Sequence, residues 1–206
     1  MIHQILKPHA HTEGTVIDRV HLYEGFSALA FLGRRRRVYR RIVALSGAQP
    51  GDRVLDVGCN GGYLVRLFAK ALGADGRVCG IDPSETAIEY ARRRAPDTCS
   101  FTVGVAQDLG FPTGSFDVVA STLAVHHIPE TERETAFREM HRVLRPGGRL
   151  LVADFRPGAH GPHTVGKGMS HINPDELDAF AENVGFKVEG RGDLPMLRYV
   201  QAMRPA

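Results

Sequence analysis

The sequence predicts an α/β fold, in which a mostly parallel β-sheet carries helices on both of its faces. Between residues 52 and 154, short runs rich in β-branched residues alternate with amphipathic stretches, the pattern of consecutive β-α-β units. Glycine or proline stands at or shortly after the end of each amphipathic stretch, where a helix must stop. The length of 206 residues favours one such domain, or one domain with a small appendage.

The composition is that of an ordinary globular protein. The chain is 43% hydrophobic and 24% charged, which excludes a disordered, collagen-like or coiled-coil protein. The net charge of +3 is too small to indicate a nucleic acid or membrane partner by itself. The longest apolar stretch, within residues 26–32, is far shorter than the roughly 20 residues that span a bilayer. We therefore expect no transmembrane segment and leave peripheral membrane contact open.

The three cysteines, Cys59, Cys79 and Cys99, form no C-x-x-C pair, and residues 1–7 do not resemble a secretory leader. We expect no disulfide framework, no metal site and a cytoplasmic location. Histidines in the Pro- and Gly-rich loops lack the acidic or cysteine partners of a metal centre.

The elements are expected in the following order. Helices at 15–32 and 33–45 precede the sheet, and Gly47 ends the second of them. Strands follow at 53–57, 77–81, 100–103, 117–121 and 150–154, with helices between them at 62–72, 84–94 and 130–143. After a loop at 156–171, Asn173 suits the N-cap and Pro174 the first position of a further helix, which ends near Gly185. Two closing strands are expected at 186–189 and 198–203.

A glycine-rich turn, DVGCNGGY at 56–63, joins the first strand to the helix that follows it. Glycines let the backbone approach a ligand closely, and the helix N-terminus offers free N–H groups. The turn departs from the dinucleotide pattern G-x-G-x-x-G, because Asn60 and Tyr63 stand where its second and third glycines belong. This spacing argues against a nicotinamide or flavin enzyme.

Asp82 ends the second strand and is expected beside the glycine-rich turn. A carboxylate in that place can accept both hydroxyls of a ribose. The alternative is that Asp82 caps the next helix, but Ser84 is better placed to do so. Since ligands of open α/β sheets bind at the point where the strand order reverses, we favour the ribose.

Two further motifs follow in order, a Phe-Asp-Val-Val run at 116–119 and a Leu-Arg-Pro-Gly-Gly run at 144–148. Together with the glycine-rich turn and Asp82, they resemble the class I S-adenosylmethionine-dependent methyltransferases in order and spacing over residues 39–154. The resemblance implies a Rossmann-like, mostly parallel seven-stranded sheet whose last strand is antiparallel. It also implies a methyltransferase domain at 49–206, with an N-terminal helical lid at 1–48 packed on it.

The resemblance further implies S-adenosyl-L-methionine as cofactor, and the family's binding residues carry over position by position. The methionine part would contact Asp56, Gly58, Cys59, Asn60 and Gly61. The ribose would contact Asp82, and the adenine Pro83, Ala106 and Gln107. The pocket would close near the sulfonium at Ser121, Thr122 and Leu123. Asn60 replaces the family's usual middle glycine, and Val105 replaces an acid that often binds the adenine amine, which leaves Gln107 or the backbone for that contact.

The N-terminal segment is similar, more weakly, to the ubiquinone and menaquinone biosynthesis C-methyltransferase branch, through Tyr-Glu-Gly-Phe at 23–26 and Phe-Leu-Gly-Arg at 31–34. In the wider family such helices cover the cofactor with an aromatic residue, which here would be Tyr23. The branch's tryptophan is absent, because the chain contains none. Quinone-like molecules are therefore one class of acceptor among several.

Two histidines, His126 and His127, follow the fourth strand, where the acceptor should approach. One of them acts as a base or orients the acceptor, or else both pack, and the sequence favours neither interpretation. If one is a base, turnover should fall as pH drops through a histidine pKa near 6.5. The arginines at 34–37, 40 and 41 are interpreted as a solvated helix face rather than a contact to phosphate or an anionic membrane surface.

Methyl transfer from S-adenosylmethionine to a small or lipophilic acceptor is the favoured function. A methyltransferase-like module that binds the cofactor without turnover is one alternative, and a nicotinamide-dependent oxidoreductase is another. A nucleic acid acceptor is not favoured, since neither an Asn-Pro-Pro-Tyr motif nor an appended RNA-binding domain is visible.

Overall fold

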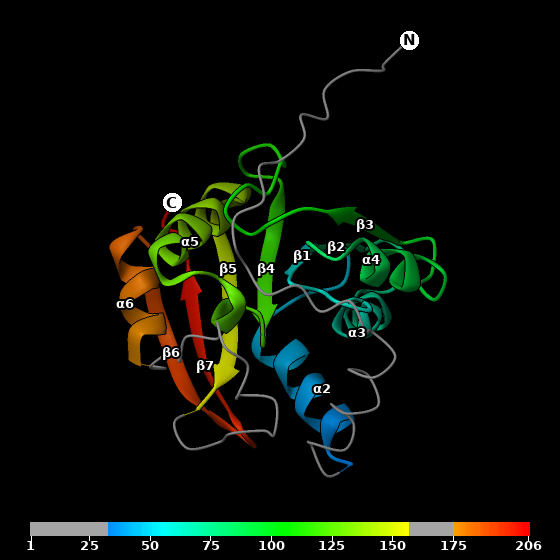
Figure 1. Ribbon diagram of the computed structural model, residues 1–206, viewed down its shortest axis with the longest axis horizontal. Coiled ribbons are helices and arrows are strands. Elements are labelled where there is room, and N and C mark those ends of the chain that lie inside the picture. The colour runs from blue at the N-terminus through cyan, green and yellow to red at the C-terminus, as the bar shows by residue number, and fades with distance from the viewer. Residues whose placement is uncertain (1–32, 157–174) are drawn as a thin grey trace.

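The computed structural model describes residues 33–156 and 175–206 (Figure 1). The expected helix at 15–32, the aromatic residue Tyr23 and the N-cap at Asn173 lie outside these residues, as does most of the 156–171 loop. The division of the chain at residue 48 accordingly stays a prediction.

The described chain forms one seven-stranded sheet of order β3-β2-β1-β4-β5-β7-β6. Its strands are β1 (Arg53–Val57), β2 (Arg77–Asp82), β3 (Cys99–Val103), β4 (Phe116–Thr122), β5 (Leu144–Phe155), β6 (Lys187–Leu194) and β7 (Leu197–Met203). Strands β1 to β5 pair in parallel, whereas β7 runs antiparallel to both β5 and β6. The strand order reverses between β1 and β4, and the predicted mostly parallel, Rossmann-like sheet is confirmed.

Helices cover both faces of the sheet because alternate residues of a strand point to opposite sides. The helices are α2 (Arg35–Leu45), α3 (Tyr63–Leu72), α4 (Glu85–Arg92), α5 (Arg133–Val143) and α6 (Asp175–Asn183). Leu55 of β1 belongs to a buried cluster with Phe137 of α5, while its neighbour Val54 belongs to another with Ile42 of α2 and Phe68 of α3. Figure 1 shows α5 and α6 on one side of the sheet and α2, α3 and α4 on the other.

Three element boundaries differ from the prediction by three residues or more. Strand β6 runs to Leu194, whereas its end was predicted at residue 189. Strand β5 begins at Leu144 instead of residue 150, because Leu144 already pairs with Phe116 of β4, and a register shift precedes the next pair, Val118 with Arg149. Helix α5 begins at Arg133 instead of residue 130, since Pro129 is followed by the short 3₁₀ helix η2 (Glu130–Glu132). A second 3₁₀ helix, η1 (Val125–His127), follows β4.

None of the helices in the described ranges is long and apolar enough to cross a lipid bilayer.

Candidate functional site

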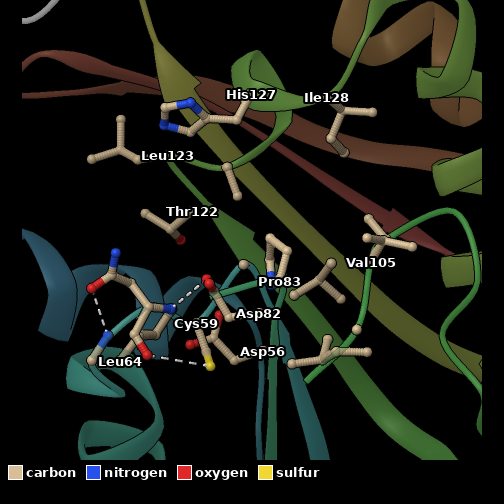
Figure 2. A pocket seen from close by; sticks show the side chains of 18 of the residues that line it. Asp56, Cys59, Leu64, Asp82, Pro83, Val105, Thr122, Leu123, His127 and Ile128 are labelled. Atoms are coloured by element: carbon tan, nitrogen blue, oxygen red, sulfur yellow. Dashed lines mark hydrogen bonds between the residues drawn. The ribbon is translucent and has the colours of Figure 1, made fainter. Parts of the chain in front are cut away.

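A cavity lies at the carboxyl edge of the sheet, between the ends of β1, β2 and β4 and the helices α2 and α3 (Figure 2). Most of the residues predicted for a cofactor site line it, namely Asp56, Gly58, Cys59, Asn60, Gly61, Asp82, Pro83, Ala106, Gln107, Thr122 and Leu123. His127 lines it as well. Ser121 and His126, which were predicted for the same site, are not part of the cavity wall.

The turn after β1 approaches its neighbours so closely that only glycine fits at position 58. Gly58 has a φ of 77°, and a Cβ atom placed there would lie 2.3 Å from the Cβ of Ala124. The backbone N–H groups of Gly58 and Cys59 both donate to the carbonyl of Ile81, at 2.8 and 3.0 Å. The turn is thereby tied to the end of β2, and its backbone forms one wall of the cavity.

Asn60 occupies the position of the family's middle glycine without losing the shape of the turn. Its φ of 45° lies in the left-handed region, which asparagine tolerates better than most residues. The Oδ1 atom accepts a hydrogen bond from the N–H of Gly61 at 2.6 Å, and the Asn60 N–H donates to Oδ2 of Asp82 at 2.8 Å. The substituted residue thus links the glycine-rich turn to the acid at the end of β2.

Asp82 is buried, and capping falls to another residue, as predicted. Its Oδ1 accepts from the N–H of Ser84 at 2.9 Å, and Ser84 caps α4 by accepting from the N–H of Ala87 at 3.2 Å. Burial raises the pKa of the Asp82 carboxyl. Each carboxylate oxygen accepts one backbone N–H and keeps a lone pair for a further donor, such as a sugar hydroxyl.

Asp56 lies beside Asp82 with only 2% of its surface exposed (Figure 2). Burial, and secondarily the charge of Asp82, raise the pKa of Asp56 to about 8. Within the described ranges no donor forms a hydrogen bond to its carboxyl group. Two neighbouring acids with unsatisfied acceptor capacity favour a ligand that brings positive charge and hydroxyl groups. The sulfonium and ribose of S-adenosylmethionine meet that description.

Cys59 contributes a small side chain rather than a reactive thiol. A Cβ atom at Gly80 would lie 2.7 Å from its Sγ, so the space behind the turn is filled. Burial, together with the charges of Asp56 and Asp82, raises the pKa of the thiol well above its ordinary value, which disfavours the nucleophilic thiolate.

Three consecutive residues at the end of β4, Ser121 to Leu123, were predicted to close the same pocket, but they have different surroundings. Ser121 is fully buried and its hydroxyl donates to the carbonyl of Val57 at 3.0 Å, so it joins two strands instead of facing the cavity. Thr122 lines the cavity, and its buried Oγ1 has no hydrogen-bond partner in the part of the chain that the structure describes. Leu123 has a φ of 57°, which turns the chain out of the strand.

The two histidines after β4 have different surroundings. His126 is buried, and its Nδ1 lies 2.7 Å from a carboxylate oxygen of Asp154. His127 faces the cavity, and burial, followed by the charge of His126, lowers its pKa to about 4. The sequence-based expectation of a titration near 6.5 therefore does not apply to the histidine in the cavity wall.

The lining residues that the sequence interpretation missed include Arg35 and Tyr39 of α2 and Tyr63 of α3. Arg35 is only 8% exposed, and its guanidinium lies 4.0 Å from the centre of the Tyr63 ring. The interpretation of every arginine in 34–41 as solvated was thus wrong for this residue. The helical spacing of Arg35 with Val38, Tyr39 and Ile42, all buried, could have revealed it.

Residues 54–148 match the model of a family described as a methyltransferase domain. The chain is 35% identical over 156 residues to a 2-phytyl-1,4-naphtoquinone methyltransferase of Synechococcus elongatus, covering 73% of this chain and 66% of that protein. It is 38% identical over 133 residues to a ubiquinone/menaquinone biosynthesis C-methyltransferase of Ectopseudomonas mendocina, covering 61% of this chain and 51% of the relative. The chain thus spans about half to two thirds of the length of these relatives.

Solved structures share the fold. A SAM-dependent methyltransferase from Aquifex aeolicus superposes with a TM-score of 0.76 at 19% identity, over 90% of this chain and 97% of the other.

Proposed function

From the premise that this chain belongs to the class I S-adenosylmethionine-dependent methyltransferases, we propose that it transfers a methyl group to a quinone-like, lipophilic small molecule. The cavity carries the proposal. Buried carboxylates line one side of it, and an apolar wall with two unsatisfied polar atoms, on Thr122 and His127, lines the other.

S-adenosylmethionine supplies, when bound, a methyl carbon that its sulfonium makes electrophilic. For the protein, the task is to orient the two reactants and exclude water. We assign the ribose hydroxyls to Asp82 and the positively charged part of the cofactor to the side of Asp56. The remaining contacts are proposed as the sequence predicted them, with Cys59, Asn60 and Gly61 along the methionine and Pro83, Ala106 and Gln107 along the adenine.

The acceptor side is predominantly apolar. Leu123, Ile128 and Pro129 line the cavity in the segment around His127, which suits a hydrophobic ring better than a sugar or a nucleotide. An electrophilic methyl group requires an electron-rich partner, whereas the ring of an oxidised quinone is electron-poor. We therefore propose the reduced, phenolic form as the acceptor. The names of two relatives, a 2-phytyl-1,4-naphtoquinone methyltransferase and a ubiquinone/menaquinone biosynthesis C-methyltransferase, support this class.

The alternatives fit less well. The departure of the glycine-rich turn from G-x-G-x-x-G disfavours a nicotinamide-dependent oxidoreductase. A binding module without turnover would not need the buried Oγ1 of Thr122 and Nδ1 of His127, which have no hydrogen-bond partner among the described residues. The proposal includes a cytoplasmic location and a lid formed by residues 1–48, as the sequence predicted.

Two measurements test the function. Mass spectrometry of the purified protein and calorimetric titration should detect tight binding of S-adenosylmethionine and S-adenosylhomocysteine. Incubation with methyl-labelled S-adenosylmethionine and anaerobic 1,4-naphthohydroquinones should give labelled product. Binding without transfer to any phenol would favour the non-catalytic module, and NADH fluorescence changes without S-adenosylmethionine binding would favour the oxidoreductase.

A further inference from the structure

A buried pair of side chains stands directly behind the histidine in the cavity wall. Asp154, near the end of β5, is 1% exposed, and its carboxylate receives three hydrogen bonds. The donors are the backbone N–H groups of His126 and Phe155, at 3.1 and 2.8 Å, and the Nδ1 of the His126 ring, at 2.7 Å. Because a carboxylate only accepts, the Nδ1 atom of His126 carries the proton. The His126 ring is thus fixed in place, with a proton on its Nδ1.

The fixed ring of His126 supports His127. The two ring centres are 4.1 Å apart, at an interplanar angle of 41°. Phe155 packs against the same His126 ring at 5.2 Å. His127 is therefore backed by a ring that Asp154 holds, and Figure 2 shows its own ring near Leu123 and Thr122, across the pocket from Asp56 and Asp82.

Two polar atoms on this side of the cavity have no partner among the described residues. They are Nδ1 of His127 and Oγ1 of Thr122, and Thr122 is 8% exposed. Buried polar atoms without hydrogen bonds are rare and disfavour the folded state, so they mark places where a ligand supplies the missing partner. Thr122 is the last residue of β4 and His127 lies in η1, which follows β4, so both atoms lie on the side of the apolar wall.

We propose that His127 accepts the proton of a phenolic hydroxyl of the acceptor, and that Asp154 and His126 are positioning residues which aim its ring and offset the charge it gains. This inference rests on the proposed function. The O–H bond of the acceptor breaks, its proton forms an N–H bond on His127, and its electron pair stays on the acceptor. The resulting phenolate would form its bond to the methyl carbon through oxygen or a ring carbon, and the electron pair of the carbon–sulfur bond that breaks would stay on sulfur. If a ring carbon is methylated, its own hydrogen would then leave as a proton and the phenolic oxygen would regain one.

The charges around His127 agree with this assignment. Burial and the charge of His126, on the same turn, lower the pKa of His127, whereas Asp154 on β5 raises it. Arg133 on α5 is buried and interacts electrostatically with Asp154, which in turn raises the pKa of Arg133 against the larger effect of burial. His127 is thus neutral at physiological pH and ready to take a proton, and the carboxylate behind it favours the protonated product.

The test uses the full-length protein and the variants His127→Gln, His126→Gln and Asp154→Asn, with His141→Gln as the matched control. His141 lies on α5, where its ring packs against Phe186, and it does not line the cavity. We expect His127→Gln to lower kcat toward 1,4-naphthohydroquinone by about a hundredfold or more, and the other two by about tenfold or more. The dissociation constant of S-adenosylmethionine should change less than about threefold in all variants.

The pH dependence separates positioning from a merely structural role. Because Asp154 raises and His126 lowers the pKa of His127, the acidic limb of the kcat profile should move to lower pH in Asp154→Asn and to higher pH in His126→Gln. A nitrogen-15 NMR titration of the His127 ring in the cofactor-free protein should show the same opposite shifts. If Asp154→Asn does not fold, His126→Gln, which keeps the carboxylate, carries the test.

His127→Gln with a kcat within about threefold of the wild type would overturn the base assignment. Unchanged His127 titration in both supporting variants would overturn the positioning role. If the wild type binds S-adenosylmethionine but methylates no phenol, the proposed function fails, and the NMR titration still decides whether Asp154 and His126 control the state of His127.

Discussion

Two buried aspartates, Asp56 on β1 and Asp154 on β5, stand at the same edge of the sheet on either side of β4, yet their surroundings differ. Asp154 is satisfied by three donors of the protein itself. Asp56 faces the cavity beside a second acid, and burial raises its pKa to about 8. A carboxylate that the fold already satisfies is part of the scaffold, whereas one that the fold leaves without donors is prepared for a ligand.

The contrast divides the edge of the sheet into two halves. On the β1 and β2 side, acidic groups and the turn backbone line the part of the cavity that we assign to the cofactor. On the β4 and β5 side, an internal Asp–His pair supports one histidine that faces the cavity. Changes on the first side should therefore affect ligand binding, and changes on the second side should affect stability and turnover.

The largest effect is expected for Asp154→Ala. It leaves two backbone N–H groups and the His126 ring without their acceptor, so the free energy of unfolding should fall by about 3–5 kcal/mol. Urea denaturation measures this change. The control is Asp178→Ala, which removes a surface ion pair to an Arg191 side chain that is 75% exposed, and should cost less than about 1 kcal/mol. Equal losses in the two variants would contradict a structural role for the Asp154 hydrogen bonds.

Asp56→Asn should remove the pH dependence that Asp56 gives to the stability of the protein and to its affinity for S-adenosylmethionine. Asp56 stays protonated in the folded, cofactor-free protein between about pH 4 and 8, while the unfolded chain ionises there, so stability falls as pH rises through this range. A bound sulfonium favours the ionised carboxyl, and affinity should rise with pH by up to about tenfold per unit below 8.

Calorimetry in two buffers of different protonation enthalpy measures the proton that Asp56 releases on binding. Asp56→Asn should release fewer protons on binding. At pH 8 its affinity for S-adenosylmethionine should fall more than its affinity for S-adenosylhomocysteine, which lacks the sulfonium charge. The same proton release in both proteins would show that Asp56 does not ionise on binding.

Asp82→Ala should weaken S-adenosylmethionine binding by about ten- to hundredfold, because each hydrogen bond to a charged acceptor contributes roughly 1.5–3 kcal/mol. Calorimetric titration provides the dissociation constant. The control is Glu85→Ala in the exposed first turn of α4, which should bind normally. An unchanged affinity in Asp82→Ala would remove this residue from the site.

The smallest effect is expected for Asn60→Gly, which restores the family's usual residue. The change relieves a left-handed side chain but removes the hydrogen bond to Gly61, so stability should change by less than about 1 kcal/mol and cofactor affinity by a few-fold. Thermal melting and titration measure both. A large loss of cofactor affinity would mean that the Asn60 side chain itself contacts the cofactor.

The local features of the sequence predicted the sheet and most of the cofactor side of the cavity. The glycine-rich turn, Asp82 and Ser84 lie within a few residues of the strand ends that position them, so their roles follow from local spacing and from the rules of parallel sheets. The extension of β5 escaped prediction because it depends on the pairing of Leu144 with Phe116 of β4 and on a register shift, which local spacing does not reveal.

What the sequence alone determined was the order of the elements and the identity of the cavity-forming turns, since both depend on residues close together in the chain. It left His126 and His127 equivalent, because they are neighbours with the same side chain. Only the tertiary structure separated them, by placing Asp154, 28 residues away, against one ring and leaving the other in the cavity wall. The burial of Arg35 was decided in the same way, by the packing of α2 against Tyr63, because a charged side chain is buried only where distant segments enclose it.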